Sequence, residues 1–384
     1  NGGEASWDNS ALLISAGATG AFLSDNIISF FAFHELALIP TFVMIGLYGR
    51  GDRRTTAWRA TLYLGLASMV LLAALLMIGT QAGFTFSGLK DFMAGGRELA
   101  HAELIGALLI AGFGTLISLF PFHSWAAPAY ASAPAPVAMM HAGVLKKFGL
   151  YGLFMFQPLM ETGFLPWTNI LLVLLVCNVI WVGYVTVNQK RLDLLLGNSS
   201  VMHMGYIFLA FAALVASGSA EANPWALKGA ALLMLAHGLT IALLFLLCGQ
   251  IEKQTGTLEI NSLGGLSTRL PRMAFVFGLA GMASIGLPGL ANFPGEFMVF
   301  FSGFAGFNDS FGPVQIATIL CLWGLVIGAV YMLRAYRNIF QGDLSKAAAY
   351  ATELLPSERA ANYFLTITLA VFGFFPTLVL QFFS

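Results

Sequence analysis

Long apolar segments alternate with short polar segments along the whole chain, and the polar segments often contain glycine or proline. Each apolar segment is close to the roughly 20 residues that an α-helix needs to cross the hydrocarbon core of a bilayer. The pattern predicts an all-α, polytopic membrane protein with about 11 transmembrane helices. The predicted crossings are residues 8–24, 27–48, 59–80, 104–120, 136–158, 166–188, 194–216, 228–250, 273–306, 313–335 and 362–381.

Proline and glycine interrupt this pattern in two places. The first break runs from Pro121 to Pro136, and the second is the Gly-Leu-Pro-Gly stretch that ends in Pro294. Proline removes a helical hydrogen bond, and irregular backbone inside a membrane is tolerated only where protein covers it or where it lines a watered cavity. Both breaks are therefore candidate transport elements. A kink, or a loop at the membrane edge, is the alternative.

Composition supports the membrane assignment and excludes several classes of function. Of the 384 residues, 58% are hydrophobic and 9% are charged, with a mean hydropathy of +0.81, whereas soluble domains carry roughly a quarter of their residues as charges. The 18 basic and 18 acidic residues balance, so no basic field for nucleic acid exists. Three cysteines (Cys177, Cys248 and Cys321) lie far apart without the spacing of an iron–sulfur, zinc or disulfide framework. No Walker A, GxGxxG, HExxH or GxSxG motif is found, so we expect no cofactor or metal in this chain.

Basic residues indicate the orientation of the chain. If the crossings alternate, most lysines and arginines fall on one side, which the positive-inside rule makes cytoplasmic. The distribution favours counting 273–306 as one broken crossing, and it places the C-terminus outside. The basic residues on the predicted cytoplasmic side are Arg50, Arg53, Arg54, Arg59, Lys190, Arg191, Lys253, Arg269, Arg272, Arg334, Arg337, Lys346 and Arg359, and those opposite are Lys90, Arg97 and Lys228.

Five ionisable residues lie near the middle of their predicted crossings: Glu35, Lys147, His203, His237 and Glu296. A charge in the hydrocarbon costs at least about 2.5–3.5 kcal/mol, so such residues persist mainly where they carry substrate or protons. A buried lysine that a movable carboxylate stabilises switches between holding and releasing a proton, and imidazoles relay protons between two nitrogens. The sequence thus predicts a row of proton-transfer groups, with Glu35 and Lys147 as a candidate switch.

Each of these residues also has a structural interpretation. Glu35 and Lys147 are candidates for a static ion pair or for snorkelling, Glu296 for a partner of a helix dipole, and the histidines for interhelical hydrogen bonds. His34, His123 and His141 are weaker candidates for proton transfer than His203 and His237. Lys146 is also a weaker candidate, because it is turned by about 100° from Lys147, so we do not expect both side chains to face one channel.

Several motifs together resemble the antiporter-like subunits of respiratory complex I, the proton-pumping NADH:quinone oxidoreductase, and are most similar to the subunit M type. They occur in the family's order over nearly the whole chain. The motifs are FHELALIP (33–40), PFHSW (121–125), HAGVLKKFGLYG (141–152), NSSVMHMG (198–205), AHG (236–238) and NFPGEF (292–297).

The resemblance implies a single proton-conducting domain over 1–384, made of two inverted repeats that each contain a broken helix. The first repeat covers roughly 8–158 and the second roughly 166–335, with a C-terminal helix at 362–381. The resemblance also implies that about three helices precede the first residue. Glu35, Lys147 and Glu296 match the family's glutamate, the lysine after the first break and the acidic residue of the second broken helix, while His203 and His237 match polar relay positions.

Two departures from the family pattern stand out. The family usually has a lysine nine residues before the tryptophan matched by Trp125, and here that position is Leu116. The proton switch is then expected to use Lys147 with His141 or His123. The alternative is that this protein pumps protons less effectively than its relatives. In the turn Gln189–Asp193, the usual order of acid and base is exchanged.

The function implied is that of a proton-translocating membrane subunit of NADH:quinone oxidoreductase, a translocase of the cell (inner) membrane. NADH, flavin, iron–sulfur and quinone chemistry is expected in partner subunits, and the other partners are membrane subunits of the complex and the lipid bilayer. The alternatives are a subunit of a multisubunit cation/proton antiporter or of a membrane-bound hydrogenase, and a non-conducting membrane scaffold.

Overall fold

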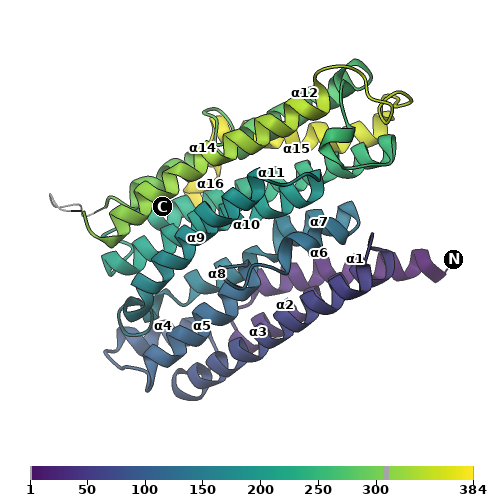
Figure 1. Cartoon of the computed structure of the whole chain (residues 1–384). Coiled ribbons are helices and arrows are strands. Elements are labelled where there is room, and N and C mark those ends of the chain that lie inside the picture. Colours follow the sequence, from purple (N-terminus) through teal and green to yellow (C-terminus); the bar gives the residue numbers. More distant parts are fainter. Residues whose placement is uncertain (1, 306–310, 384) are drawn as a thin grey trace.

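The computed structural model describes residues 2–305 and 311–383, which form an almost entirely helical bundle (Figure 1). The described residues also contain two isolated β-bridges, and none of them forms a β-strand. The predicted all-α fold is confirmed. The α-helices are α1 (Gly2–Leu23), α2 (Ile27–Tyr48), α3 (Arg53–Ala82), α4 (Phe86–Ala94), α5 (Ala102–Ile117), α6 (Ala126–Ser132), α7 (Ala135–Met140), α8 (Lys147–Met155), α9 (Thr168–Val187), α10 (Leu192–Ser217), α11 (Pro224–Thr255), α12 (Pro271–Ser284), α13 (Asn292–Ser302), α14 (Pro313–Phe340), α15 (Pro356–Phe374) and α16 (Thr377–Leu380).

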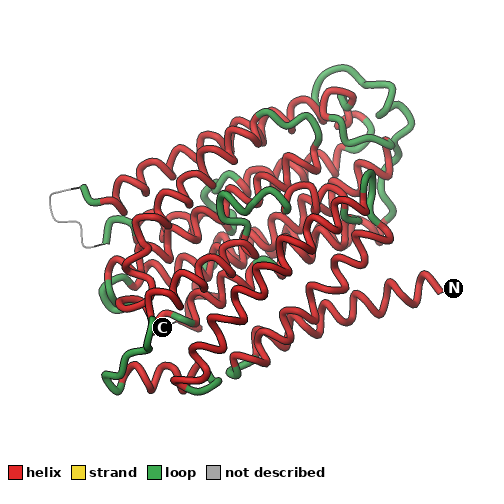
Figure 2. Tube along the Cα trace, turned by 60° about the horizontal axis from the view of Figure 1, so that its bottom comes forward, coloured by secondary structure: helices red, strands yellow, loops and turns green. Residues whose placement is uncertain are grey.

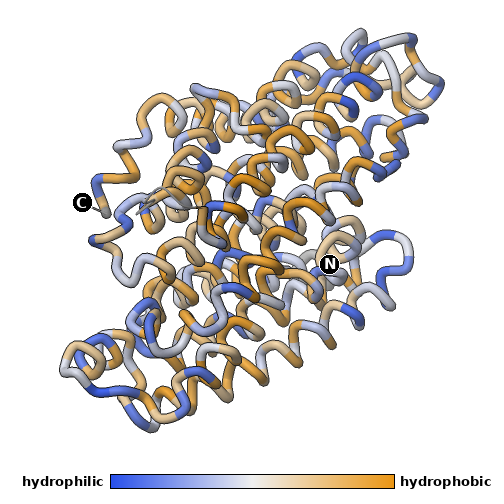
Figure 3. The backbone as a smooth tube through the Cα atoms, turned by 60° about the vertical axis from the view of Figure 1, so that its left-hand side comes forward, coloured by the Kyte–Doolittle hydropathy of each residue, from blue (hydrophilic) through white to orange (hydrophobic). Residues whose placement is uncertain are grey.

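The long helices run side by side, and most loops lie at the two ends of the bundle, with a few loop segments between the helices (Figure 2). Polar residues are concentrated in these end regions, with mainly apolar residues between them (Figure 3). Within the described residues, six helical segments are each long and apolar enough to cross a membrane: Ile27–Tyr48, Arg53–Ala82, Gln157–Val187, Leu192–Ser217, Pro224–Thr255 and Pro313–Phe340. The remaining predicted crossings coincide with α1, with α15 and with three interrupted helical segments. These segments are α5 followed by α6, α7 followed by α8, and α12 followed by α13.

Local sequence explains where several helices begin. The side chain of Asn26 accepts hydrogen bonds from the amides of Ile28 and Ser29, which caps the N-terminus of α2. Proline is the first residue of four further α-helices, where its missing N–H and fixed φ cost nothing. These helices are α11 (Pro224), α12 (Pro271), α14 (Pro313) and α15 (Pro356).

Helix α10 lies at the centre of the bundle (Figure 1). From Leu192 to Val215 every residue except Leu194 is buried, because α9, α11, α13, α14 and α6 pack around it. A helix that is covered on all sides needs no amphipathic pattern. Its buried polar residues, which include Asn198 and His203, therefore face other helices and not lipid.

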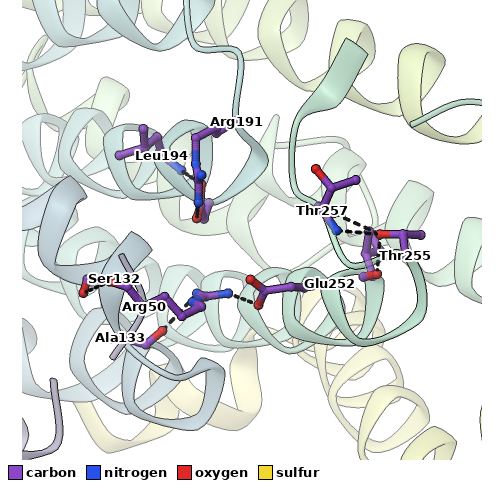
Figure 4. Close-up of polar contacts among 10 residues, drawn as sticks. Arg50, Ser132, Ala133, Arg191, Leu194, Glu252, Thr255 and Thr257 are labelled. Carbon is purple, nitrogen blue, oxygen red and sulfur yellow. Dashed lines mark hydrogen bonds and ion pairs between the residues drawn. The ribbon is translucent and has the colours of Figure 1, made fainter. Parts of the chain in front are cut away.

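One end of the bundle collects the basic loops, as the alternation of crossings predicts. Arg50, after α2, forms an ion pair with Glu252 on α11 and donates to the carbonyl of Ala133 at 3.0 Å (Figure 4). Arg191 binds both carboxylate oxygens of Asp193, at 3.2 and 2.7 Å, and this hydrogen-bonded carboxylate raises the pKa of Arg191. The exchanged order of acid and base in this turn thus produces a local pair.

The first break follows α5. Ser118 has a φ of 72°, the left-handed conformation, and the amide of Leu119 donates to the carbonyl of Gly114 at 2.7 Å, so α5 ends in a Schellman motif. The chain is irregular until α6 begins at Ala126. The predicted start of this break at Pro121 was a few residues late. Pro128 lies inside α6, and Pro134 and Pro136 lie at the turn into α7. The crossing predicted as 104–120 therefore continues through α6.

The second break has the same backbone geometry. Gly286 has a φ of 78°, and the amide of Leu287 donates to the carbonyl of Met282 at 3.1 Å. Helix α12 starts near the basic end, and α13 ends where the carbonyl of Ser302 accepts from Asn223 at the opposite end of α11. Residues 271–302 therefore make one broken crossing, as predicted. Residue 306, the predicted end of this crossing, lies outside the described residues.

Asn178 on α9 holds the first break against the bundle. Its amide nitrogen donates to the carbonyls of Ser118 at 3.1 Å and Val201 at 3.2 Å, and its oxygen accepts from the amide of Phe120 at 2.5 Å. The side chain is completely buried. One asparagine therefore satisfies backbone groups that the broken helix leaves unpaired inside the membrane.

Replacing Asn178 by alanine is expected to lower the free energy of unfolding by about 1–3 kcal/mol, because buried backbone groups lose their partners. Thermal unfolding in detergent measures the effect. Asn169→Ala is a matched control, since Asn169 is an exposed residue on the same helix. Equal midpoints for the two variants would show that Asn178 does not hold the break.

Candidate functional site

Lys147, the first residue of α8, makes the central contact of the site. Its ammonium nitrogen lies 3.0 Å from Nδ1 of His237 on α11 and donates to the carbonyl of Ala142 at 2.5 Å. Both side chains are almost completely buried. An ammonium group has donors only, so His237 accepts at Nδ1 and carries its own ring proton on Nε2 when Lys147 is charged. One buried hydrogen bond therefore joins the two side chains.

Two glycines explain why these side chains meet. Gly143, in a π-helical turn (His141–Leu145), and Gly238 on α11 face each other across the interface. A Cβ atom on Gly238 would lie 2.7 Å from the carbonyl oxygen of Gly143, closer than real Cβ atoms approach other atoms. Small residues at a membrane helix interface permit such close approach of two backbones. The close approach brings Lys147 within reach of His237.

His203 on α10 continues the row from His237. The two imidazole ring centroids are 5.3 Å apart. Nδ1 of His203 lies 2.7 Å from the carbonyl of Ser199, and Nε2 lies 2.9 Å from the carbonyl of Ser284. A neutral imidazole has one N–H, whereas the imidazolium has two. Only the charged ring donates to both carbonyls, so the hydrogen bonds that His203 makes depend on its protonation.

The Ser284 carbonyl belongs to the second break. Ser284 is the last residue of α12, so its carbonyl has no partner four residues later in the same helix. The C-terminal end of a helix also carries a partial negative charge that favours a nearby cation. The broken helix therefore supplies both a hydrogen-bond acceptor and a favourable dipole to His203.

Glu296 lies in α13, just beyond the break. Its side chain is 3% exposed, and its Oε1 atom has no hydrogen-bond partner among the described residues. The carboxylate packs so closely against Gly286 that a Cβ at this glycine would lie 1.9 Å from Oε2. The positive φ of Gly286 and this close approach together require glycine there. Glu296 thus faces the gap between the two halves of the broken helix.

Glu35 on α2 lies apart from Lys147. Ser68 on α3 donates to its carboxylate at 2.5 Å, and Nδ1 of His34 lies 3.3 Å from the same oxygen. The Glu35 side chain is 29% exposed. Among the described residues no ion pair joins Glu35 to Lys147. The expected direct pairing is not formed in this conformation, and His34, whose ring centroid is 5.7 Å from that of Phe148, lies between the two regions.

The weaker candidates gather near the first break. His141 is buried, with its ring centroid 5.3 Å from that of Tyr130, and the His123 ring stacks on Phe120. Lys146 is buried and points toward Tyr130 on α6, while Lys147 points toward α11. Leu116, where the resemblance places a lysine in relatives, is buried in the last turn of α5.

Sequence reasoning missed several polar residues of the site. Ser68 holds Glu35, and Thr240 on α11 donates to the side-chain oxygen of Asn292 on α13 at 3.0 Å. The ring of Tyr206 is 5.6 Å from that of His203, and its hydroxyl has no partner among the described residues. Asn292 and Tyr206 lie within four residues of predicted site residues, and this spacing could have identified them. No feature of the sequence distinguishes Ser68 from other serines.

Taken together, buried titratable groups from α8, α11 and α10 lie next to one another in a row that ends at a broken helix. Buried titratable groups on neighbouring helices of a membrane bundle are typical of membrane proteins of the proton-translocating class.

Comparison with known proteins identifies the family. Residues 24–351 match the family model described as "NADH:quinone oxidoreductase/Mrp antiporter, TM". NAD(P)H-quinone oxidoreductase chain 4 1 from a Synechococcus strain is 31% identical over 96% of this chain and 69% of its own length. Chain 4 2 from Microcystis aeruginosa is 33% identical over 90% of this chain and 61% of its own length. The chain thus spans about two thirds of these relatives.

A solved structure agrees. A chain of respiratory complex I from Thermus thermophilus, with 27% sequence identity, superposes with a TM-score of 0.85 over 96% of this chain and 75% of that one. The chain therefore belongs to the NADH:quinone oxidoreductase/Mrp antiporter membrane family.

Gly238→Ala is expected to destabilise the protein by about 1–3 kcal/mol, because the added methyl group forces α11 away from the Gly143 carbonyl. Thermal unfolding in detergent tests this expectation. Gly65→Ala on α3 is the control, since a Cβ there meets no atom within 4 Å. A Gly238→Ala variant as stable as this control would contradict the close approach of the two helices.

Proposed function

We propose that this chain is a proton-conducting membrane subunit of an NADH:quinone oxidoreductase. NADH oxidation, flavin and iron–sulfur electron transfer and quinone reduction are assigned to partner subunits. The observation that carries the proposal is the buried contact from Lys147 to His237, followed by His203. A lysine and two histidines held in line inside a membrane bundle have a ready use in proton transfer and little use in packing alone.

The row supports a simple sequence of proton movements. The Lys147 ammonium gives its proton to Nδ1 of His237, which leaves a neutral amine and an imidazolium. His237 then releases its other ring proton toward His203. The carbonyls of Ser199 and Ser284 stabilise the protonated His203. Because Lys147 and His203 flank one imidazole, like charges on both repel, so the row favours one proton at a time.

Glu35 and Glu296 are proposed as the acidic groups at the two ends of the row. Glu35 is partly accessible and hydrogen-bonded to Ser68, which suits a group that reports a change in a neighbouring subunit. Glu296, buried beside the break, suits a group that receives the proton from the His203 region. His123, His141 and Lys146 remain proposed contributors at the first break.

The chain is also proposed to consist of two repeats. Ser118 in the first break and Gly286 in the second are the left-handed residues of the same kind of Schellman motif. Each broken crossing begins at one end of the bundle and finishes at the opposite end, and the two run in opposite directions between the basic loops and the other end. Equivalent breaks in opposite orientation are typical of inverted repeats.

Exchange of a cation for protons is the alternative function, because the family model covers Mrp antiporters as well. An antiporter subunit would exchange sodium for protons without NADH. Measuring sodium-dependent proton movement in the same vesicles, with NADH absent, distinguishes the two functions.

Lys147→Ala in the full-length subunit is expected to lower NADH-driven proton uptake into inverted vesicles by at least about tenfold, since a positioned proton-transfer group contributes that much or more. NADH:quinone turnover should fall with it if the two are coupled. The assembled amount of the complex must be measured for each variant.

Lys90→Ala is the matched control, because Lys90 is an exposed lysine on the short helix α4. Wild-type proton uptake in an assembled Lys147→Ala complex would refute the proposed proton path and leave the scaffold interpretation standing.

A further inference from the structure

A second lysine is buried at the first break. Lys146 is 2% exposed, and its ammonium nitrogen has no hydrogen-bond partner among the described residues. Its nearest aromatic contact is the ring of Tyr130, whose centroid is 5.4 Å away. The attraction of an aromatic ring at this distance is smaller than the cost of removing an ammonium group from water. Tyr130 alone therefore does not stabilise a charged Lys146.

Other buried polar side chains lie near Lys146. Nδ1 of His141 is buried and has no hydrogen-bond partner among the described residues, and the buried hydroxyls of Tyr130 and Ser118 have at most each other as partners. The Ser118 side chain neighbours the Tyr130 hydroxyl, and the Tyr130 and His141 rings are in edge-to-face contact. We call these four residues the Lys146 pocket. Buried polar groups that protein atoms do not pair are the usual partners of internal water.

The backbone places the two lysines in separate environments. The turn from His141 to Leu145 is π-helical, and the Lys146 amide donates to the His141 carbonyl at 3.1 Å, five residues back. A single π turn widens a helix and is frequent at functional sites. Lys146 faces α6, and Lys147 faces α11. Because the residues are adjacent, a charge on one amine disfavours a charge on the other.

We propose that the Lys146 pocket is a second proton site, in which Lys146 takes up and releases a proton through water held by Tyr130, His141 and Ser118. The inference rests on the proposed proton conduction and extends it to the first break. In the loading step, an excess proton that arrives along the water passes to the neutral amine of Lys146, which leaves neutral water and an ammonium group. In the release step, the ammonium returns this proton to water, and Lys147 is then able to carry the charge.

Lys146→Arg distinguishes a proton carrier from a structural cation. Arginine retains the positive charge and the contact with the Tyr130 ring, but it does not release its proton. In assembled complex in inverted vesicles, we expect both Lys146→Arg and Lys146→Met to lower NADH-driven proton uptake by at least about tenfold. Lys90→Arg is the control for this exchange at an exposed site. Wild-type uptake in either Lys146 variant overturns the proposal.

Tyr130→Phe tests the pocket without changing the charge, and it keeps the proposal falsifiable if the larger arginine prevents assembly. The ring remains, and only the hydroxyl is lost. We expect uptake to fall several-fold, whereas Tyr350→Phe, at a 91% exposed loop residue, leaves uptake unchanged. Wild-type proton uptake in the Tyr130→Phe variant overturns the proposal that the Lys146 pocket is a proton site. Lys147→Ala is measured in parallel to separate the proton path at Lys147 from the second site at Lys146. If proton uptake falls in Lys147→Ala but stays at the wild-type level in the Lys146 variants, only the second site is refuted.

Discussion

Backbone that leaves a helix inside a membrane must find hydrogen-bond partners in the protein, and this constraint organises the structure. Both broken crossings expose carbonyls where α5 and α12 end. At the first break, Asn178 and the indole of Trp125 supply the donors, with Trp125 bonding the Thr115 carbonyl at 3.0 Å. At the second break, His203 binds the Ser284 carbonyl. One break is satisfied by groups that hold no exchangeable charge, and the other by a group that titrates.

This difference gives the two breaks different chemistry within similar backbone geometry. A neutral asparagine fixes its break in one arrangement, because its donors and acceptor are all occupied. A histidine between two carbonyls has a hydrogen-bond pattern that depends on its protonation. Under the proposed function, a proton that arrives on His203 would change the hydrogen bonding at the end of α12.

The sequence was sufficient to predict the membrane crossings, because each is an apolar run of the required length. The sequence was not sufficient to predict how each helix is rotated about its axis, and so which neighbour each side chain faces. In helices that are apolar on every side, no polar face reports the direction of a side chain. The contact of Lys147 with His237, where Glu35 was the expected partner, depends on the glycine contact between Gly143 and Gly238.

The direction of Lys146 was equally hidden, since the π turn before it changes the helical phase that a sequence count assumes. The first break was placed late for a related reason. Prolines mark where helices are disfavoured, but α5 ends earlier, at a serine in the left-handed conformation, a conformation that serine seldom adopts. Pro128, in turn, is tolerated in the first turn of α6.

The burial of α10 has a consequence for the synthesis of the protein. Ribosomes deliver helices in chain order, so α10 enters the bilayer before α12 and α14 exist. Until those helices arrive, His203 lacks the Ser284 carbonyl, and Ser199 lacks the Tyr331 hydroxyl that lies 2.7 Å from it in the finished bundle. A nascent chain at this stage presents unpaired polar groups to lipid, at a cost that only later helices remove. The innermost helix of the fold is thus among the last to reach its final environment.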